Sequence, residues 1–196
     1  MASVISIDMG SSSVRVLGFD SDCALVSSVQ GRRSVRMDPT TNTFDAEEYL
    51  LATEEAMDEA LRGCVAAGGS NGAPEGSEGA PEGGGIKVVA ISCFAMSLVQ
   101  VDPGGRALSP VYTYASSASA GAALRLRERL REKGVLERVE QCTAPVHASY
   151  APALFARLLE EEPTRDLGGG GATWVTLACF LLSRLTGKPQ PVNSIP

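Results

Sequence analysis

The stretch VISIDMGSSSVRVLGFD, Val4 to Asp20, places two short apolar runs on either side of the polar segment DMGSSS. A tight hairpin needs only a two-residue turn such as Asn-Gly, so an acid, a glycine and three serines at the joint call for another explanation. Glycine lets a ligand approach the backbone closely, and successive N–H groups with small hydroxyls form a concavity suited to anions. Taken alone, the segment fits a phosphate-binding loop and a polar turn without a ligand equally well.

Composition restricts the class of protein. The 196 residues are 44% hydrophobic, which is enough for a core, and the formal net charge of −6 argues against a nucleic-acid surface. The five cysteines contain no Cys-x-x-Cys pair, and the single histidine, His147, has no cysteine at zinc-ligand spacing. The N-terminal residues do not resemble an export signal, and the last apolar stretch is shorter than the roughly 20 residues that span a bilayer. We therefore expect a cytoplasmic protein that binds neither nucleic acid nor membrane, in which His147 is a hydrogen-bonded, partly buried histidine and not a catalytic one.

The N-terminal half alternates between strand and helix patterns. Three β runs, at residues 4–7, 14–19 and 24–30, predict a meander of neighbouring strands. Residues 68–85 contain almost no large apolar side chain and predict a disordered insertion. The nearly continuous apolar run IKVVAISCF, residues 86–94, predicts a central strand covered on both faces. Between the meander and the insertion, FDAEE predicts a helix from Asp45 with one apolar face, formed by Tyr49, Leu50, Thr53, Met57, Leu61 and Cys64.

The C-terminal half has the pattern of a hairpin followed by helices. The turn PGGR, residues 103–106, joins SLVQVD to ALSPVYTY. Residues 121–133 predict a charged helix whose arginines form a solvated face, because Glu128 and Glu132 are interleaved with them. Ser149 is in position to cap a further helix that has Pro152 in its first turn. Residues 173–186 predict a last, buried helix that stops at Gly187.

The position of the opening loop separates it from two familiar nucleotide sites. A Walker loop and a dinucleotide fingerprint both lie between a strand and a helix, and neither GxxxxGK[ST] nor GxGxxG occurs in this sequence. A glycine-serine loop in the first hairpin instead resembles that of the ATPase fold shared by actin, hexokinase and sugar kinases. DMGSSSVR resembles the first phosphate motif of the FGGY carbohydrate kinases. Four further segments resemble the same family in the same order, namely FDAEEYL, IKVVAISCFAMSLVQVDPGGRALSPVYTYASS, QCTAPVHASYAPALFARL and TWVTLACFLLSRLTGKP.

The whole chain, residues 1–196, thus resembles the N-terminal portion of an FGGY kinase, with gluconokinase-like members the most similar. The resemblance implies a ribonuclease H-like α/β domain of the actin and hexokinase type, with a mixed β-sheet and flanking helices, here incomplete. It implies an ATP- and Mg²⁺-dependent transfer of the γ-phosphate to a hydroxyl of a sugar, polyol or sugar acid such as gluconate. In the cofactor site that it implies, Asp8 orients Mg²⁺ through water, Arg15 adds positive charge, and backbone amides wrap the ATP phosphates, those of Gly10, Ser11, Ser12 and Ser13.

The substrate side departs from the family pattern. Where such members have Trp-His before the matching serine, this chain has Ala95 and Met96 before Ser97. In the stretch after the hairpin, Tyr114 keeps the aromatic position, but Ser116 replaces the family's acid and Ala118 replaces its arginine. Losing a buried polar partner costs about 1–3 kcal/mol, so either the substrate differs or the site is degenerate. The resemblance assigns substrate binding to the positions of Met96, Ser97, Tyr114 and Ser116.

The resemblance also places the family's catalytic base, second phosphate motif and adenosine pocket beyond Pro196, so no catalytic residue is assigned within the chain. The alternative function is a non-catalytic pseudokinase or truncated fragment that acts through partner binding. A homodimer is compatible with both interpretations.

Overall fold

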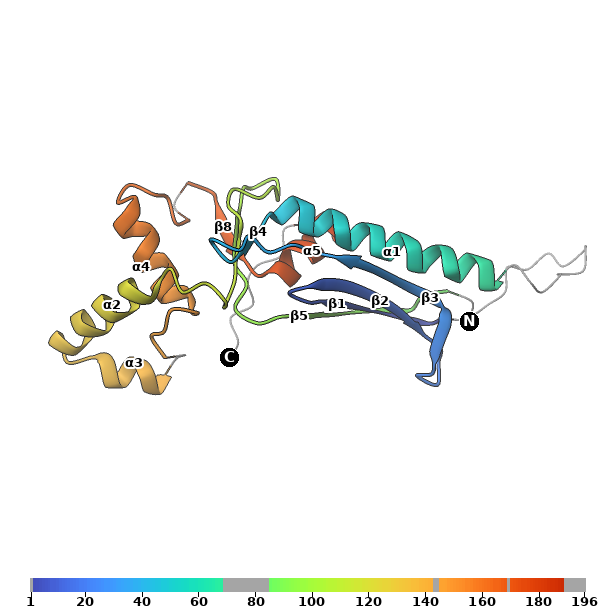
Figure 1. Cartoon of the computed structure of the whole chain (residues 1–196), viewed down its shortest axis with the longest axis horizontal. Coiled ribbons are helices and arrows are strands. Elements are labelled where there is room, and N and C mark those ends of the chain that lie inside the picture. Colours follow the sequence, from blue (N-terminus) through green and yellow to red (C-terminus); the bar gives the residue numbers. More distant parts are fainter. Residues whose placement is uncertain (1, 69–84, 143–144, 169, 189–196) are drawn as a thin grey trace, which may run out of the picture. The chain divides into compact units, whose positions relative to one another are not determined.

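The computed structural model of the chain describes residues 2–68, 85–142, 145–168 and 170–188 (Figure 1). They fold into two compact units, the first made of Met1–Arg36 and Glu47–Phe94 and the second of Met37–Ala46 and Ala95–Pro196. The disordered insertion predicted at residues 68–85 lies, apart from its two end residues, outside the described residues.

The first unit is built on a mixed four-stranded sheet. It contains β1 (Val4–Met9), β2 (Ser13–Phe19), β3 (Leu25–Ser34) and β5 (Val88–Cys93), in the order β3-β2-β1-β5. The first three strands are antiparallel neighbours, which confirms the predicted meander, and β5 runs parallel to β1. This mixed sheet with flanking helices is the predicted α/β fold class.

Helix α1 (Ala46–Gly68) packs on the β2–β3 side of this sheet. A Cβ added at Gly31 of β3 would lie 1.9 Å from the carbonyl oxygen of Ala56, so the helix backbone touches the strand there. Ala56 and Ala60 are fully buried, whereas Leu61 is 41% exposed. The helix thus turns small alanines to the sheet in place of the predicted Met57 and Leu61, because only small side chains permit this close approach.

Strand β5 corrects the prediction of a central, covered strand. It is the last strand of the sheet, and Val88 and Val89 are 52% and 48% exposed. Helix α1 approaches the sheet at β3, which is the strand at the opposite edge of the sheet from β5. An apolar run predicts that a strand can be buried on both faces, but the coverage depends on tertiary packing.

The second unit has two short strand pairs and four helices among its described residues. Strands β4 (Thr43–Phe44) and β7 (Val111–Tyr112) pair antiparallel, as do β6 (Val99–Val101) and β8 (Thr173–Val175). The chain folds back through single bridges, Leu98 to Tyr112 and Val101 to Ala107, so the predicted hairpin is present in outline. The helices are α2 (Ala120–Glu132), α3 (Leu136–Cys142), α4 (Ala151–Glu161) and α5 (Leu177–Thr186).

Two predicted helix starts in this unit are wrong. Residues 173–175 form strand β8, and α5 begins only after Thr176, whose Oγ1 accepts a hydrogen bond from the Cys179 N–H at 3.2 Å. The N-cap position of α4 is Tyr150, which makes no side-chain capping bond, and the hydroxyl of Ser149 donates to the Tyr114 carbonyl oxygen at 2.9 Å. In both cases a long-range contact overrides the local pattern.

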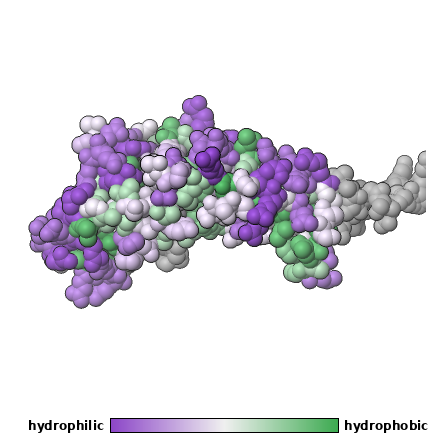
Figure 2. Space-filling model, viewed as in Figure 1, coloured by the Kyte–Doolittle hydropathy of each residue, from purple (hydrophilic) through white to green (hydrophobic). Residues whose placement is uncertain are grey.

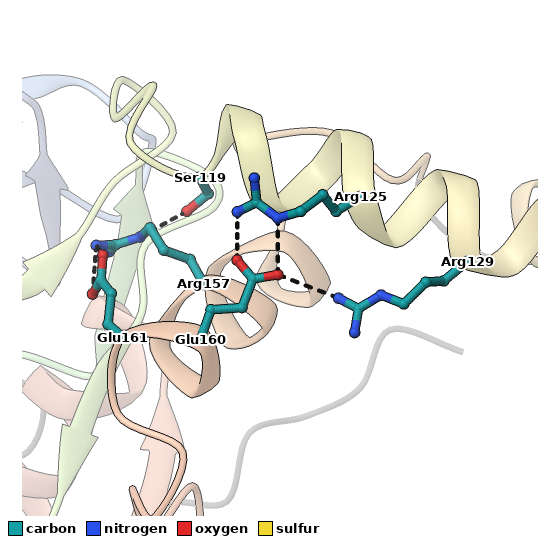
Figure 3. Close-up of polar contacts among 6 residues, drawn as sticks. All are labelled: Ser119, Arg125, Arg129, Arg157, Glu160 and Glu161. Carbon is teal, nitrogen blue, oxygen red and sulfur yellow. Dashed lines mark hydrogen bonds and ion pairs between the residues drawn. The ribbon is translucent and has the colours of Figure 1, made fainter.

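Three arginines of α2 contact acids on neighbouring helices. Arg125 and Arg129 both contact Glu160 of α4 (Figure 3), and Arg127 contacts Glu140 of α3. The acids that these three arginines contact thus come from α3 and α4, not from the interleaved Glu128 and Glu132 of α2. Ion pairs near the surface contribute little each, but those of Arg125 and Arg129 share Glu160 and so link α2 to α4 at two points.

The surface shows no single large apolar region on the face drawn in Figure 2, where hydrophilic side chains predominate and apolar ones form separate small groups. None of the described helices combines the length and the hydropathy needed to cross a membrane.

Candidate functional site

The glycine-serine loop connects β1 to β2 in the first unit. The Gly10 N–H donates to the Ser13 carbonyl oxygen at 3.1 Å, and the Ser12 carbonyl oxygen accepts from the Val35 N–H at 3.1 Å. Gly10 therefore uses its N–H within the loop, whereas the N–H groups of Ser11 and Ser12 donate to no acceptor in the described part of the chain. A Cβ added at Gly10 would lie 2.9 Å from the Ser13 carbonyl oxygen, which explains the glycine at this position.

Ser13 carries an unsatisfied polar group beside the loop. The residue is 2% exposed, and its Oγ has no hydrogen-bond partner among the described residues. Buried hydroxyls in folded proteins are nearly always hydrogen-bonded, so such a group calls for an acceptor from outside the unit. A phosphate oxygen is an acceptor of the required kind.

Tyr49 of α1 forms a hydrogen bond to the glycine-serine loop. Its hydroxyl donates to the Gly10 carbonyl oxygen at 2.8 Å, and its ring meets Phe94 edge-on with the centroids 6.4 Å apart. Burial, assisted by neighbouring Cys93 and Asp8, raises the pKa of Tyr49 above its ordinary value. The phenol therefore keeps its proton and stays a hydrogen-bond donor to the loop.

A charged row crosses the sheet at the end where the loop lies. The strand registers place Arg32 beside Arg15, Arg15 beside Asp8, and Asp8 beside Ser92. Residues that pair directly across strands project from the same face, and two like charges there repel each other. Neither arginine forms an ion pair within the described residues. An anion bound beside this row would therefore reduce the repulsion between Arg15 and Arg32. The sequence analysis missed Arg32, because the strand predicted at residues 24–30 ends two residues before it.

Asp8 fits the limited role that Mg²⁺ bound to a nucleotide asks of a protein. Mg²⁺ keeps several waters and takes one or two carboxylates together with phosphate oxygens. Asp8 is a half-buried carboxylate that lies directly across from Arg15. No cluster of three or more His, Cys, Asp or Glu side chains suited to a metal occurs among the residues that the structure describes. A single carboxylate can orient a hydrated, phosphate-bound Mg²⁺ but cannot hold the ion alone.

A pocket of about 300 Å³ lies within the second unit. Its wall combines the segment after β5, the end of strand β7, the first turn of α4, and the residues that precede α2, α4 and α5. Met96, Ser97 and Ser116, three of the four predicted substrate positions, line it. The fourth, Tyr114, is 46% exposed and does not line it, but its carbonyl oxygen accepts from Ser149, which does.

The backbone at Met96 is in the left-handed region, with φ of 57°. Residues other than glycine, asparagine and aspartate rarely adopt this conformation, and it costs of the order of 1–3 kcal/mol. The strained residue is 43% exposed and stands at the edge of the pocket beside Ser97, which is 2% exposed. The turn thus presents the Ser97 side chain inward at an energetic cost, as binding sites often require.

Sequence reasoning missed several residues of this pocket, among them Thr113, Ser119, Ser149 and Tyr150. They come from three separate segments, after β7, before α2 and before α4, and their common feature is a hydroxyl-bearing side chain. His147 is exposed, against the expectation of a partly buried position, and its Nδ1 accepts from the Ser149 N–H at 3.3 Å. Its ring lies edge-on to that of Tyr150, which lines the pocket.

No known protein-family description matches the chain, and no curated protein is similar to it in sequence. Solved structures are similar in fold. Xylulose kinase from Bifidobacterium adolescentis matches 97% of this chain with a TM-score of 0.69 and 18% identity, over 35% of its own length. Gluconate kinase from Lactobacillus acidophilus matches 95% with a TM-score of 0.66 and 18% identity, over 33% of its length. Plasmodium falciparum glycerol kinase, solved with ADP, matches 94% with a TM-score of 0.66 and 14% identity, over 34% of its length.

These matches extend over nearly the whole chain but over only about a third of each solved kinase. The chain therefore has the fold of one part of the carbohydrate kinases.

Proposed function

We propose that the chain is the N-terminal part of an ATP- and Mg²⁺-dependent carbohydrate kinase of the FGGY type. The full protein would transfer the γ-phosphate of ATP to a hydroxyl of a sugar, polyol or sugar acid, a class that includes gluconate. The observation that carries the proposal is the charged row beside a loop with unused N–H groups. The loop lies in the first hairpin of a fold that is shared with solved kinases, one of which was solved with ADP.

The proposed roles follow from the geometry of the loop. The Ser11 and Ser12 N–H groups and the unsatisfied Ser13 hydroxyl would bind phosphate oxygens, and Arg15 would compensate their charge. Phosphoryl transfer depends chiefly on positioning and on charge stabilisation of this kind. Mg²⁺ supplies further charge neutralisation when bound, and Asp8 would orient it through water.

Isothermal titration of the 196-residue chain with ATP, in Mg²⁺ and in EDTA, tests the proposal. We expect ATP binding that depends on Mg²⁺, and a loss of about tenfold in affinity in Arg15→Ala, because a charge-assisted phosphate contact contributes about 1.5 kcal/mol or more. Asp8→Asn should abolish the Mg²⁺ dependence.

Arg62→Ala is the matched control for Arg15→Ala. Arg62 is an exposed arginine of α1 next to Gly63, which packs on Ser28 at the far end of β3 from the loop. Its removal should leave ATP affinity unchanged. The proposal is contradicted if the chain binds no ATP, or if the Arg15 and Arg62 variants behave alike.

The second candidate function is a non-catalytic domain that acts through partner binding. It is supported by the second-unit pocket, none of whose described lining residues carries a charged side chain. A chain that binds neither Mg²⁺-ATP nor a small sugar would favour this function.

A further inference from the structure

The pocket in the second unit offers a ligand apolar walls and neutral hydroxyls. Met96, Leu98, Leu154 and three alanines supply the apolar part. The described lining residues include no Asp, Glu, Lys, Arg or His. Burying a carboxylate without a cation is strongly unfavourable, so a sugar acid is a poor ligand for such a wall.

Most hydroxyls around the pocket are already hydrogen-bonded within the protein. Thr113 Oγ1 donates to the Asn42 carbonyl oxygen at 2.7 Å, and Ser149 Oγ donates to the Tyr114 carbonyl oxygen at 2.9 Å. Ser97 Oγ accepts from the Leu177 N–H at 3.4 Å, and Thr176 Oγ1 caps α5. A fully hydroxylated sugar would therefore compete with these internal bonds, and any of its hydroxyls that lay against the apolar wall without a partner would oppose binding.

Several hydroxyls retain hydrogen-bonding capacity toward a ligand. Those of Tyr112, Ser116 and Tyr150 make no hydrogen bond within the described part of the chain, and Thr176 Oγ1 only accepts from Cys179, so its hydrogen can be donated. Ser119 stands at the N-cap of α2 but does not cap the helix, since its Oγ accepts from Arg157 Nε at 3.2 Å (Figure 3). Because that bond uses a lone pair of Ser119, its hydroxyl hydrogen remains available to donate.

The positive charge of Arg157 is paired within the protein and does not line the pocket. Its guanidinium forms an ion pair with Glu161 at 2.9 Å and lies 5.7 Å from the centre of the Tyr112 ring. Arg157 does not itself line the pocket, whereas Ser119 does. It is therefore a positioning residue that orients Ser119 and brings no free positive charge to the pocket.

From these contacts we propose that the pocket binds a neutral deoxy sugar, a ligand with a few hydroxyls and at least one carbon that carries none. The volume of about 300 Å³ suits one such small molecule. The inference rests on the proposed function in that the pocket is the substrate side of a carbohydrate kinase. It narrows the substrate class from sugars, polyols and sugar acids to neutral deoxy sugars.

Fluorescence of the chain's one tryptophan reports on the pocket. Trp174 packs against Leu154, and its ring lies 6.0 Å from that of Tyr112, both of which line the pocket. The probes are D-fucose, D-galactose and D-galacturonate, which differ only in carrying a methyl, hydroxymethyl or carboxylate group on the same ring. The corresponding set, 6-deoxy-D-glucose, D-glucose and D-glucuronate, repeats the comparison with another ring configuration.

We expect the methyl sugar to bind about tenfold more tightly than the hydroxymethyl sugar in whichever set binds, and the carboxylate to bind more weakly still. The proposal is overturned if the carboxylate binds as tightly as the neutral sugars. It is equally overturned if the hydroxymethyl sugar binds more tightly than the methyl sugar, or if no probe of either set binds.

Variants separate the pocket from its surroundings. Ser116→Ala and Tyr150→Phe each remove a hydroxyl of the pocket wall, and each should weaken binding of the methyl sugar several-fold. Ser117→Ala is the matched control, because Ser117 is the exposed neighbour of Ser116 and does not line the pocket. Equal effects of the Ser116 and Ser117 variants on affinity would overturn the assignment.

The two proposals fail in distinguishable ways. ATP binding is tested on the loop of the first unit and sugar binding on the pocket of the second. A chain that binds Mg²⁺-ATP but prefers the carboxylate sugar keeps the proposed function and loses the deoxy-sugar inference. A chain that prefers the methyl sugar but binds no ATP supports the proposed ligand class and contradicts the proposed kinase function.

Discussion

Replacement of Tyr49 by phenylalanine tests the link between α1 and the glycine-serine loop. The change keeps the ring, which is 2% exposed and packs edge-on against Phe94, and removes only the hydroxyl that donates to Gly10 at 2.8 Å. The Gly10 carbonyl oxygen then loses this donor. A neutral hydrogen bond contributes about 0.5–1.5 kcal/mol, and leaving a buried acceptor without its partner costs about 1–3 kcal/mol. We therefore expect Tyr49→Phe to destabilise the first unit by about 1–3 kcal/mol.

Hydrogen exchange followed by mass spectrometry measures this loss where it occurs. Peptides that span β1 and β2 should exchange roughly five- to 150-fold faster in Tyr49→Phe, which corresponds to the same free energy. Tyr150→Phe is the control with the same chemical change, because the Tyr150 hydroxyl makes no hydrogen bond to another described residue. It should leave exchange of β1 and β2 unchanged. Unaltered exchange in Tyr49→Phe, or equal changes in both variants, would refute this account of the loop.

Three further predictions concern packing, capping and pH. Gly31→Ala should lower the free energy of unfolding by 1 kcal/mol or more, roughly, in urea titrations, since its Cβ would overlap the Ala56 carbonyl oxygen; unchanged stability would contradict the close approach of α1. Thr176→Ala should cost about 0.5–2 kcal/mol by removing the cap of α5, with Thr176→Ser restoring most of it. The hydrogen bond from Arg125 lowers the pKa of Glu160 below 4.5, so the pair stabilises the fold above that pH and less as pH falls through the lowered pKa; Glu160→Gln should flatten this part of the stability–pH profile.

The first unit could be predicted from the sequence where local pattern determines structure. The alternation around Asp8 and Arg15 places both on one face, and the antiparallel register confirms that they lie side by side. Coverage could not be predicted in the same way. Strand β5 is exposed at Val88 and Val89, and α1 packs at the opposite edge of the sheet, where Gly31 permits its close approach. No local sequence pattern indicates which strand a helix will cover.

The second unit depends more on long-range contacts. Trp174 belongs to an apolar run that fits a helix or a strand, and pairing with β6 decides for the strand. Ser119 has the residue type of a helix cap, but Arg157, distant in sequence, binds its hydroxyl and turns it from the helix to the pocket. The pocket could be predicted only in part, through Met96, Ser97 and Ser116, because its other hydroxyls come together only in three dimensions.

The most direct test of the central claim is a residue-resolved titration of the ¹⁵N-labelled chain with Mg²⁺-ADP, followed by amide chemical shifts. We predict that the Ser11 and Ser12 amides, which donate to no described acceptor, move most, while the indole N–H of Trp174 in the second unit stays in place. Absence of shifts at Ser11 and Ser12, or shifts confined to the second unit, would contradict a nucleotide phosphate site in this loop.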